Sequence, residues 1–115
     1  MARSLIDQMT DTVARRVRVP RDLERITTYG DEHGDPAVIE PIWEGVEAVY
    51  RTGMHPGMQV CIRHQGEVVV HRAIGHARGH VPGRRFDADR VAPMRTDTPV
   101  NLFSAAKAVT AMVMH

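Results

Sequence analysis

Apolar residues recur at helical spacing in two early segments of the chain. In residues 4–18 they lie four apart, with charged residues between them, which predicts an amphipathic helix packed on the domain as an extension. A second helix is expected over 38–52, with Pro41 in its first turn and Gly53 at its end. Turn-forming residues between the two predict a linker over 27–37. The apolar stripe of the second helix consists of Ile39, Ile42, Trp43, Val46, Val49 and Tyr50.

The apolar period changes to two in residues 57–75, on both sides of Gln65-Gly66. This alternation predicts a β-hairpin with a tight turn that contains glycine. Cys61 shares a strand face with polar neighbours, and we expect it to be a structural thiol. Residues 75–99 are rich in Gly, Arg, Asp and Pro, which predicts a long surface connection with little regular structure.

The segment from Val100 to Met114 is small, apolar and nearly uncharged. A helix that is apolar on most faces belongs in a protein interior, so we expect a buried helix. The preceding elements offer few partners for it. The chain is therefore expected to be the N-terminal part of a larger protein and, by itself, to expose a large apolar patch and be poorly soluble. The elements together predict an α+β fold built from N-terminal helices, an antiparallel hairpin and the start of a buried helix.

Composition narrows the class of protein. The chain has 115 residues, with 15 basic and 14 acidic side chains, which suits one domain or part of one. A dedicated nucleic-acid or anionic-membrane binder would carry a clear excess of basic residues, which this chain lacks, so its composition argues against both classes. We see no apolar stretch of about 20 residues and no secretory signal pattern, and we therefore expect a cytoplasmic protein without a membrane span. A single cysteine excludes an intrachain disulfide framework.

The seven histidines do not predict a metal site. His71, His76 and His80 are close in sequence, but glycines separate them and their spacing suits no common zinc site. The aspartates lack the spacing of a calcium loop, and the glycines do not form a phosphate-binding turn. We therefore expect neither a metal nor a cofactor.

The candidate chemistry lies in the apolar C-terminal segment. Of the 15 basic residues only Lys107 is a lysine, and it follows Ser104, one of two serines, by three positions. Residues three apart share a helix face, so the lysine amine can reach the serine hydroxyl. A serine nucleophile needs a base, and a lysine shielded from water can lose its proton to become one, whereas arginine cannot. This interpretation requires a dry Lys107 amine that points toward Ser104.

A second interpretation of the same residues is structural. A serine before an apolar run is often a helix cap, and a lysine near the end of an apolar helix often extends its amine to water. On this hypothesis the chain is a noncatalytic interaction module whose C-terminal apolar helix docks on a partner chain.

Residues 102–111, with the sequence LFSAAKAVTA, resemble the nucleophile helix of the serine β-lactamase-like hydrolases. That superfamily includes class C β-lactamases, related carboxylesterases and penicillin-binding proteins. The upstream order is similar: a helix, Pro56-Gly57 opening a hairpin, and a polar stretch before the serine. The resemblance covers about residues 38–115, as the N-terminal portion of the domain. It leaves residues 1–37 as a helical extension and linker.

The resemblance implies a covalent mechanism on a small ester or β-lactam-like substrate, most simply an esterase reaction. Ser104 would be the nucleophile, and Lys107 the general base, alone or with a tyrosine. The family's Tyr-x-Asn and Lys-Thr-Gly-like elements are absent from this sequence, and Tyr29 and Tyr50 precede the serine and take no role. We therefore expect the isolated chain to show little or no turnover.

Overall fold

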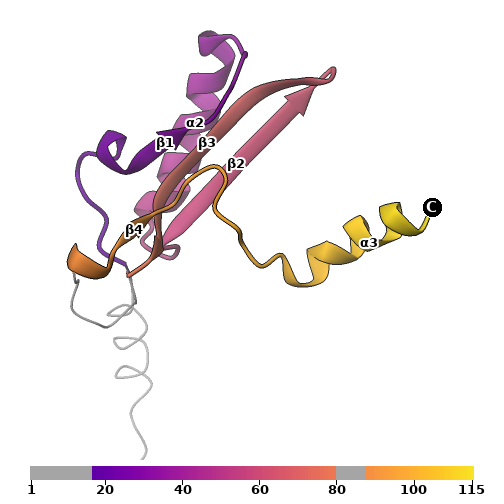
Figure 1. Cartoon of the computed structure of the whole chain (residues 1–115). Helices are drawn as coiled ribbons and strands as arrows, with labels where there is room; N and C mark the ends of the chain where they lie inside the picture. Colours follow the sequence, from indigo (N-terminus) through magenta and orange to yellow (C-terminus); the bar gives the residue numbers. More distant parts are fainter. Residues whose placement is uncertain (1–16, 80–87) are drawn as a thin grey trace, which may run out of the picture.

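A computed structural model of the chain describes residues 17–79 and 88–115 (Figure 1). Most of the helix expected over 4–18 lies outside these residues. The described part holds helices on one side of a small antiparallel sheet, and a further helix beyond it, which confirms the predicted α+β class.

The hairpin is the centre of the sheet. Strand β2 (Gly57–His64) pairs with β3 (Glu67–Arg78) in antiparallel register, with a shift between Ile62 and Arg63. The turn residues Gln65 and Gly66 have φ values of 51° and 86°. Two consecutive left-handed residues give the turn that best fits the twist of a hairpin. The predicted hairpin is therefore confirmed.

Two short strands were not expected from the sequence. Strand β1 (Thr27–Tyr29) pairs with β3 inside the predicted linker, so the linker prediction is wrong there. Strand β4 (Ala92–Pro93) pairs with the far end of β3 inside the predicted irregular connection. Strand β1 pairs with Arg72–Ile74 on the edge of β3 opposite β2, and β4 pairs with His76 and Arg78, where β3 extends past β2. Each short strand satisfies backbone groups that the hairpin alone leaves unpaired.

Helix α2 (Pro36–Arg51) confirms the second predicted helix and starts two residues earlier than expected. The Asp35 side chain accepts a hydrogen bond of 2.9 Å from the Ala37 N–H, and Gly53 follows the helix with φ 72°. Because Asp35 caps the helix, Pro36 occupies the first turn. Pro41 lies in the helix interior, which corrects its predicted place.

Helix α2 lies along one face of the sheet and builds the core with it (Figure 1). From the predicted stripe, Ile39, Trp43 and Tyr50 are buried, whereas Ile42 and Val49 lie at the exposed edge. The core cluster consists of Leu23, Trp43, Tyr50 and Ile74. Leu23 and β1 thus tie the segment before α2 into the same body as the hairpin.

The C-terminal segment projects away from the sheet (Figure 1). A 3-10 turn, η3 (Phe103–Ala105), leads into helix α3 (Ala106–Met114), so a helix forms where one was predicted. Every residue from 101 to 115 is exposed. The expected burial of this helix is wrong for the described residues, because α3 projects away from the sheet and contacts mainly the η3 turn that precedes it. None of the helices in the described ranges has the length and apolar character needed to cross a bilayer.

Candidate active site

The loop that leads to Ser104 is fastened to the sheet. The side-chain amide of Gln59 on β2 donates hydrogen bonds to the carbonyl oxygens of Arg95 (2.6 Å) and Thr98 (2.7 Å). The Thr98 hydroxyl closes the same turn by accepting from the Arg95 N–H at 2.9 Å. A polar strand residue therefore fixes where the chain leaves the sheet towards the candidate nucleophile.

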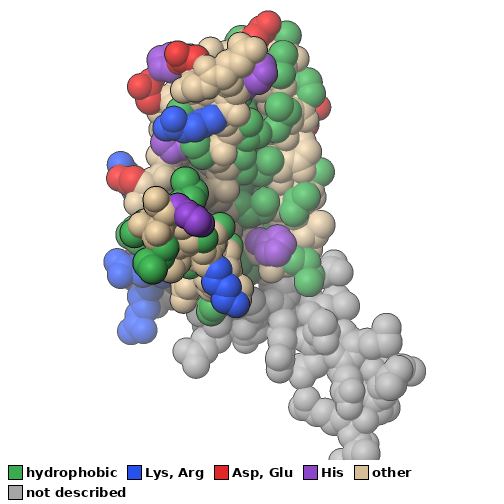
Figure 2. Space-filling model, turned by 90° about the vertical axis from the view of Figure 1, so that its right-hand side faces the viewer, with side chains coloured by type: hydrophobic (Ala, Val, Ile, Leu, Met, Phe, Trp, Pro, Cys, Tyr) green, Lys and Arg blue, Asp and Glu red, His purple; other side chains and the backbone are tan. Residues whose placement is uncertain are grey.

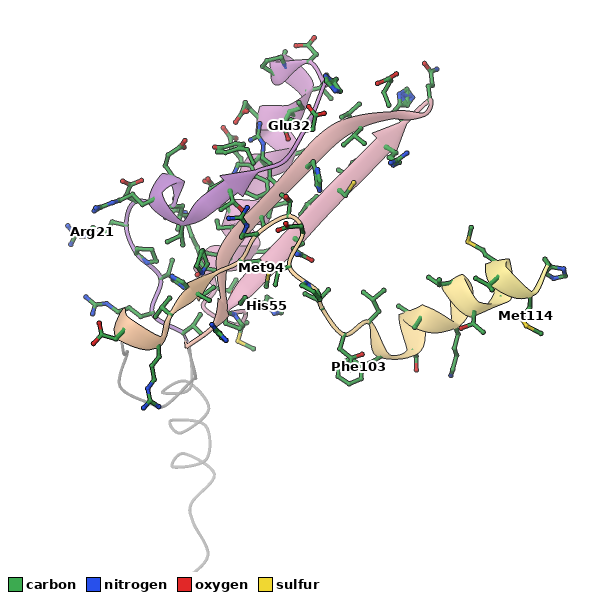
Figure 3. The ribbon with its side chains drawn as sticks, viewed as in Figure 1. Arg21, Glu32, His55, Met94, Phe103 and Met114 are labelled. Atoms are coloured by element: carbon green, nitrogen blue, oxygen red, sulfur yellow. The ribbon has the colours of Figure 1, made fainter. Side chains whose placement is uncertain are left out.

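Beyond this loop, the backbone turns sharply at Phe103 (Figure 3). Phe103 has φ 48°, and its N–H donates to the Asn101 Oδ1 atom at 3.0 Å. The Ala105 N–H donates to the Leu102 carbonyl at 3.1 Å and closes the 3-10 turn. Ser104 thus follows directly on a left-handed residue, in a turn closed by two local hydrogen bonds.

Ser104 does not serve as a helix cap. The residue that precedes α3 is Ala105, and no side chain caps either η3 or α3. In the described residues, the Ser104 hydroxyl makes no hydrogen bond. This removes the cap explanation for the serine and leaves its hydroxyl exposed to solvent.

Lys107 lies three residues after Ser104, in the first turn of α3. On a regular α-helix, side chains three residues apart share a face, with Cβ atoms about 5–6 Å apart. Both side chains are exposed, and within the part of the chain that the structure describes no hydrogen bond joins them. The expectation of a dry Lys107 is therefore corrected, because α3 has no apolar cover among the described elements.

The two tyrosines lie on the sheet body. Tyr50 is fully buried against Gly75, and burial raises the pKa of its phenol. Tyr29 stacks on Arg72, and burial, followed by the nearby Glu24 carboxylate, raises the pKa of Tyr29. Tyr50 is part of the core that holds α2, which leaves its hydroxyl without access to an exposed serine.

The buried ion-pair cluster around Arg72 was not predicted from the sequence. Arg72 is 5% exposed, and its guanidinium donates to Glu32 at 2.8 and 3.0 Å and to Glu40 at 2.9 Å. It also lies 4.9 Å from the Tyr29 ring centroid and 5.5 Å from that of Trp43. The signal was present, since Arg72 stands between Val70 and Ile74 at the strand spacing of buried residues.

The opposite charges in this cluster stabilise one another. Burial raises the pKa of Glu32, but hydrogen bonds from Arg72 and from the His71 N–H, with the Arg72 charge, outweigh burial and lower that pKa overall. Burial lowers the pKa of Arg72, but the hydrogen bonds and charges of Glu32 and Glu40 outweigh burial, so the pKa of Arg72 lies above its ordinary value. The cluster holds β1, β3 and α2 together and is a structural feature, distant in sequence from Ser104.

No described group of side chains forms a ligand site at Ser104. A hollow of about 410 Å³ is lined by Arg18, Arg21 and His76 with two apolar residues, and one of about 500 Å³ lies beside Arg78 and Arg90. Neither includes Ser104 or Lys107. Among the residues described, no three His, Cys, Asp or Glu side chains come together as metal ligands.

The surface around Ser104 is apolar. Figure 2 looks from the side on which α3 projects and shows hydrophobic side chains gathered at the surface there. The most exposed are Phe103, Met112, Val113 and Met114, each 79–82% accessible. Ser104 in η3 and Lys107 in α3 therefore lie on an apolar segment that the other described elements leave uncovered.

An α+β body with a hairpin, followed by a helix that carries Ser-x-x-Lys, is the arrangement expected of a serine β-lactamase-like chain. A family model described as beta-lactamase matches residues 46–115, more than half of the chain. The chain therefore belongs to the beta-lactamase family, which confirms the resemblance. No curated protein and no solved structure matches it. The matched segment covers the last six residues of α2, the hairpin, Ser104 and Lys107.

Proposed function

We propose that this chain is part of a serine hydrolase in which Ser104 is the nucleophile that becomes acylated and Lys107 is the general base. The observation that carries the proposal is the family match, because it runs through the Ser-x-x-Lys segment. The uncapped, exposed Ser104 hydroxyl supports it. The substrate class is a small ester or β-lactam-like molecule, with an esterase reaction as the simplest case.

The proposed chemistry has two steps. The Ser104 Oγ attacks the substrate carbonyl, its proton passes to the Lys107 amine, and the leaving group departs with that proton. Water then attacks the acyl-enzyme and gives a proton to the same amine. The amine passes this proton to the Ser104 oxygen as the acyl–oxygen bond breaks, which releases the acid and restores the serine and the free amine. Each bond that forms at the carbonyl carbon is matched by one that breaks, and neither step needs a metal or cofactor.

The described residues do not shield the Lys107 amine from water, as its role as a base requires. Water stabilises the charged form of an exposed amine, and only the uncharged amine can accept the serine proton. We therefore propose that, near neutral pH, Lys107 is an effective base only when further protein surface covers α3. The chain alone should show little turnover, as the sequence also led us to expect.

The remaining assignments are proposals of the same standing. We assign the hydrolase domain to residues 38–115, with residues 1–37 as an extension that contributes Leu23 and β1 to the sheet body. We propose a cytoplasmic protein that acts on small molecules and does not bind nucleic acid.

Fluorophosphonate labelling of the chain tests the roles of Ser104 and Lys107. The serine oxygen bonds to phosphorus and fluoride leaves, so each labelled serine is read by peptide mass. Ser4, the other serine of the chain, gives the background rate in the same tube. At pH 10, where more lysine amine is uncharged, we expect Ser104 to react at least about tenfold faster than Ser4.

Lys107→Arg is the matched variant, because it keeps the positive charge but cannot act as a base. We expect it to bring labelling of Ser104 down to the rate of Ser4, while Ser104→Ala removes the labelled peptide. Equal rates at Ser104 in the wild type and in Lys107→Arg would contradict the role of Lys107. Equal rates at Ser104 and Ser4 in the wild type would contradict the nucleophile.

The exposure of α3 favours a second candidate function, an interaction module in which this helix docks on a partner chain and the Ser–Lys pair is incidental. The labelling experiment separates the two candidates. A module predicts that Ser104 reacts no faster than Ser4 in any variant.

A further inference from the structure

We infer that Asn101 is a positioning residue for Ser104: its side chain holds Phe103 in the left-handed conformation that sets the direction of the serine. This inference rests on the role proposed for Ser104. It concerns a residue that contacts neither Ser104 nor Lys107 by side chain and acts through the backbone of Phe103 alone.

The starting observation is the backbone of Phe103. Two residues other than glycine have positive φ in the described chain, Gln65 and Phe103. Gln65 is explained by the hairpin turn, where its neighbour Gly66 is left-handed too. Phe103 has no such turn partner, and left-handed backbone is unfavourable for a side chain with an aromatic ring.

Packing does not hold Phe103 in this conformation. Its side chain is 80% exposed and points away from the sheet body (Figure 3). Two local hydrogen bonds hold it: the Asn101 Oδ1 atom accepts the Phe103 N–H at 3.0 Å, and the Leu102 carbonyl accepts the Ala105 N–H at 3.1 Å. Of these, the first is the one that a side chain supplies. Asparagine side chains commonly bind the backbone two residues on and so stabilise turns. Strained backbone that is kept in place by its surroundings is typical of functional sites.

The consequence for Ser104 is geometric. The Phe103 φ angle determines how the peptide that carries Ser104 is rotated relative to the preceding loop. That loop is held to β2 through Gln59 at Arg95 and Thr98, and Phe103 sets the direction that the chain takes five residues beyond Thr98. If Asn101 no longer accepts the Phe103 N–H, Phe103 can relax to negative φ, and Ser104 with α3 swings away.

The first test does not depend on activity. Hydrogen exchange of the Phe103 amide, measured by NMR, should be about threefold or more faster in Asn101→Ala than in the wild type. Asn101→Asp keeps an acceptor oxygen and should stay within about twofold of the wild type. The neighbouring substitution Val100→Ala serves as the control and should leave this amide unchanged. An unchanged Phe103 amide in Asn101→Ala overturns the inference.

The second test uses the rate of fluorophosphonate labelling at Ser104, normalised to Ser4. Asn101→Ala should lower this rate about fivefold, and Asn101→Asp should restore it. In the Phe103→Gly background the left-handed backbone is favourable without help, so Asn101→Ala should cost less than about twofold there. An equal loss in both backgrounds shows that Asn101 does not act through Phe103 and overturns the inference.

The two proposals fail separately. If Ser104 of the wild type labels no faster than Ser4, the proposed function is contradicted, and the amide exchange alone decides whether Asn101 holds Phe103. If Ser104 labels fast and the two backgrounds respond alike, the nucleophile stands and the positioning role of Asn101 is overturned.

Discussion

At the scale of single residues, Arg72 is the side chain on which the described body depends most. It is buried and paired with Glu32, which is half-buried, and with the more exposed Glu40. We expect Arg72→Met to lower the free energy of unfolding by about 3 kcal/mol, because Glu32 would keep a buried charge without its main partner. Urea unfolding followed by circular dichroism measures the change.

The matched control is Arg51→Met. Arg51 pairs with Glu47 on the surface of α2 at 3.8 Å, and both side chains are partly exposed. Such pairs contribute at most about 1 kcal/mol. Equal losses in the two variants would show that burial of Arg72 adds nothing to its ion pairs.

Glu32 makes the stability of the fold depend on pH. Despite its burial, the pKa of Glu32 is lower in the folded chain than in the unfolded chain. A carboxylate of this kind stabilises the fold above its unfolded pKa, and the stabilisation is lost as the pH falls through the folded pKa. We expect unfolding to become easier as the pH falls below about 4.5, less steeply in Glu32→Gln. Glu44→Gln, on the exposed face of α2, should keep the wild-type slope.

At the scale of elements, α2 contains a residue that opposes it. Pro41 lies in the helix interior, where it removes the hydrogen bond to the Ala37 carbonyl and its ring crowds that carbonyl. Its side chain is exposed, so its removal costs no core packing. We expect Pro41→Ala to raise the free energy of unfolding by about 1–3 kcal/mol in urea titrations. A decrease would show that the proline sets a bend that the core needs.

Periodicity in the sequence was enough to predict the elements that are stabilised locally. The stripe of α2 and the alternation around Gln65-Gly66 each encode their own geometry, and both elements were predicted. Strands β1 and β4 were not, because two or three residues carry no period and are strands only through pairing with β3. The site behaves in the same way: the Ser104–Lys107 spacing is visible in the sequence, whereas the left-handed Phe103 depends on a side-chain contact.

At the scale of the whole molecule, the described chain divides into a packed body and a projecting helix. The body has a core under α2, an ion-pair cluster and a fastened loop, each of which limits its motion. Helix α3 contacts mainly η3, and the other described elements contact it less or not at all. The residues proposed for chemistry therefore lie on the least supported part of the molecule, and the support they receive comes through the Asn101–Phe103 turn.

The exposed face of α3 predicts how the chain behaves in solution. Met112 and Val113 are 79% and 80% exposed, next to other apolar side chains on the same helix. Contiguous apolar surface of this kind drives association, so we expect the chain to form larger species as its concentration rises. Sedimentation velocity of a dilution series measures this. The double substitution Met112→Gln with Val113→Gln should shift the chain towards the monomer.

Met54→Gln is the control for that experiment, because Met54 is 61% exposed but lies in the turn after α2 and not on α3. It should leave the association unchanged, since a single exposed apolar side chain is common on soluble proteins. If the α3 double variant and the control sediment alike, the apolar face of α3 is not what joins the chains. The apolar face of α3 is also the surface that further protein would cover to shield Lys107 from water. Polar substitutions on this face prevent association without shielding Lys107, so the double variant should not label faster at Ser104 than the wild type.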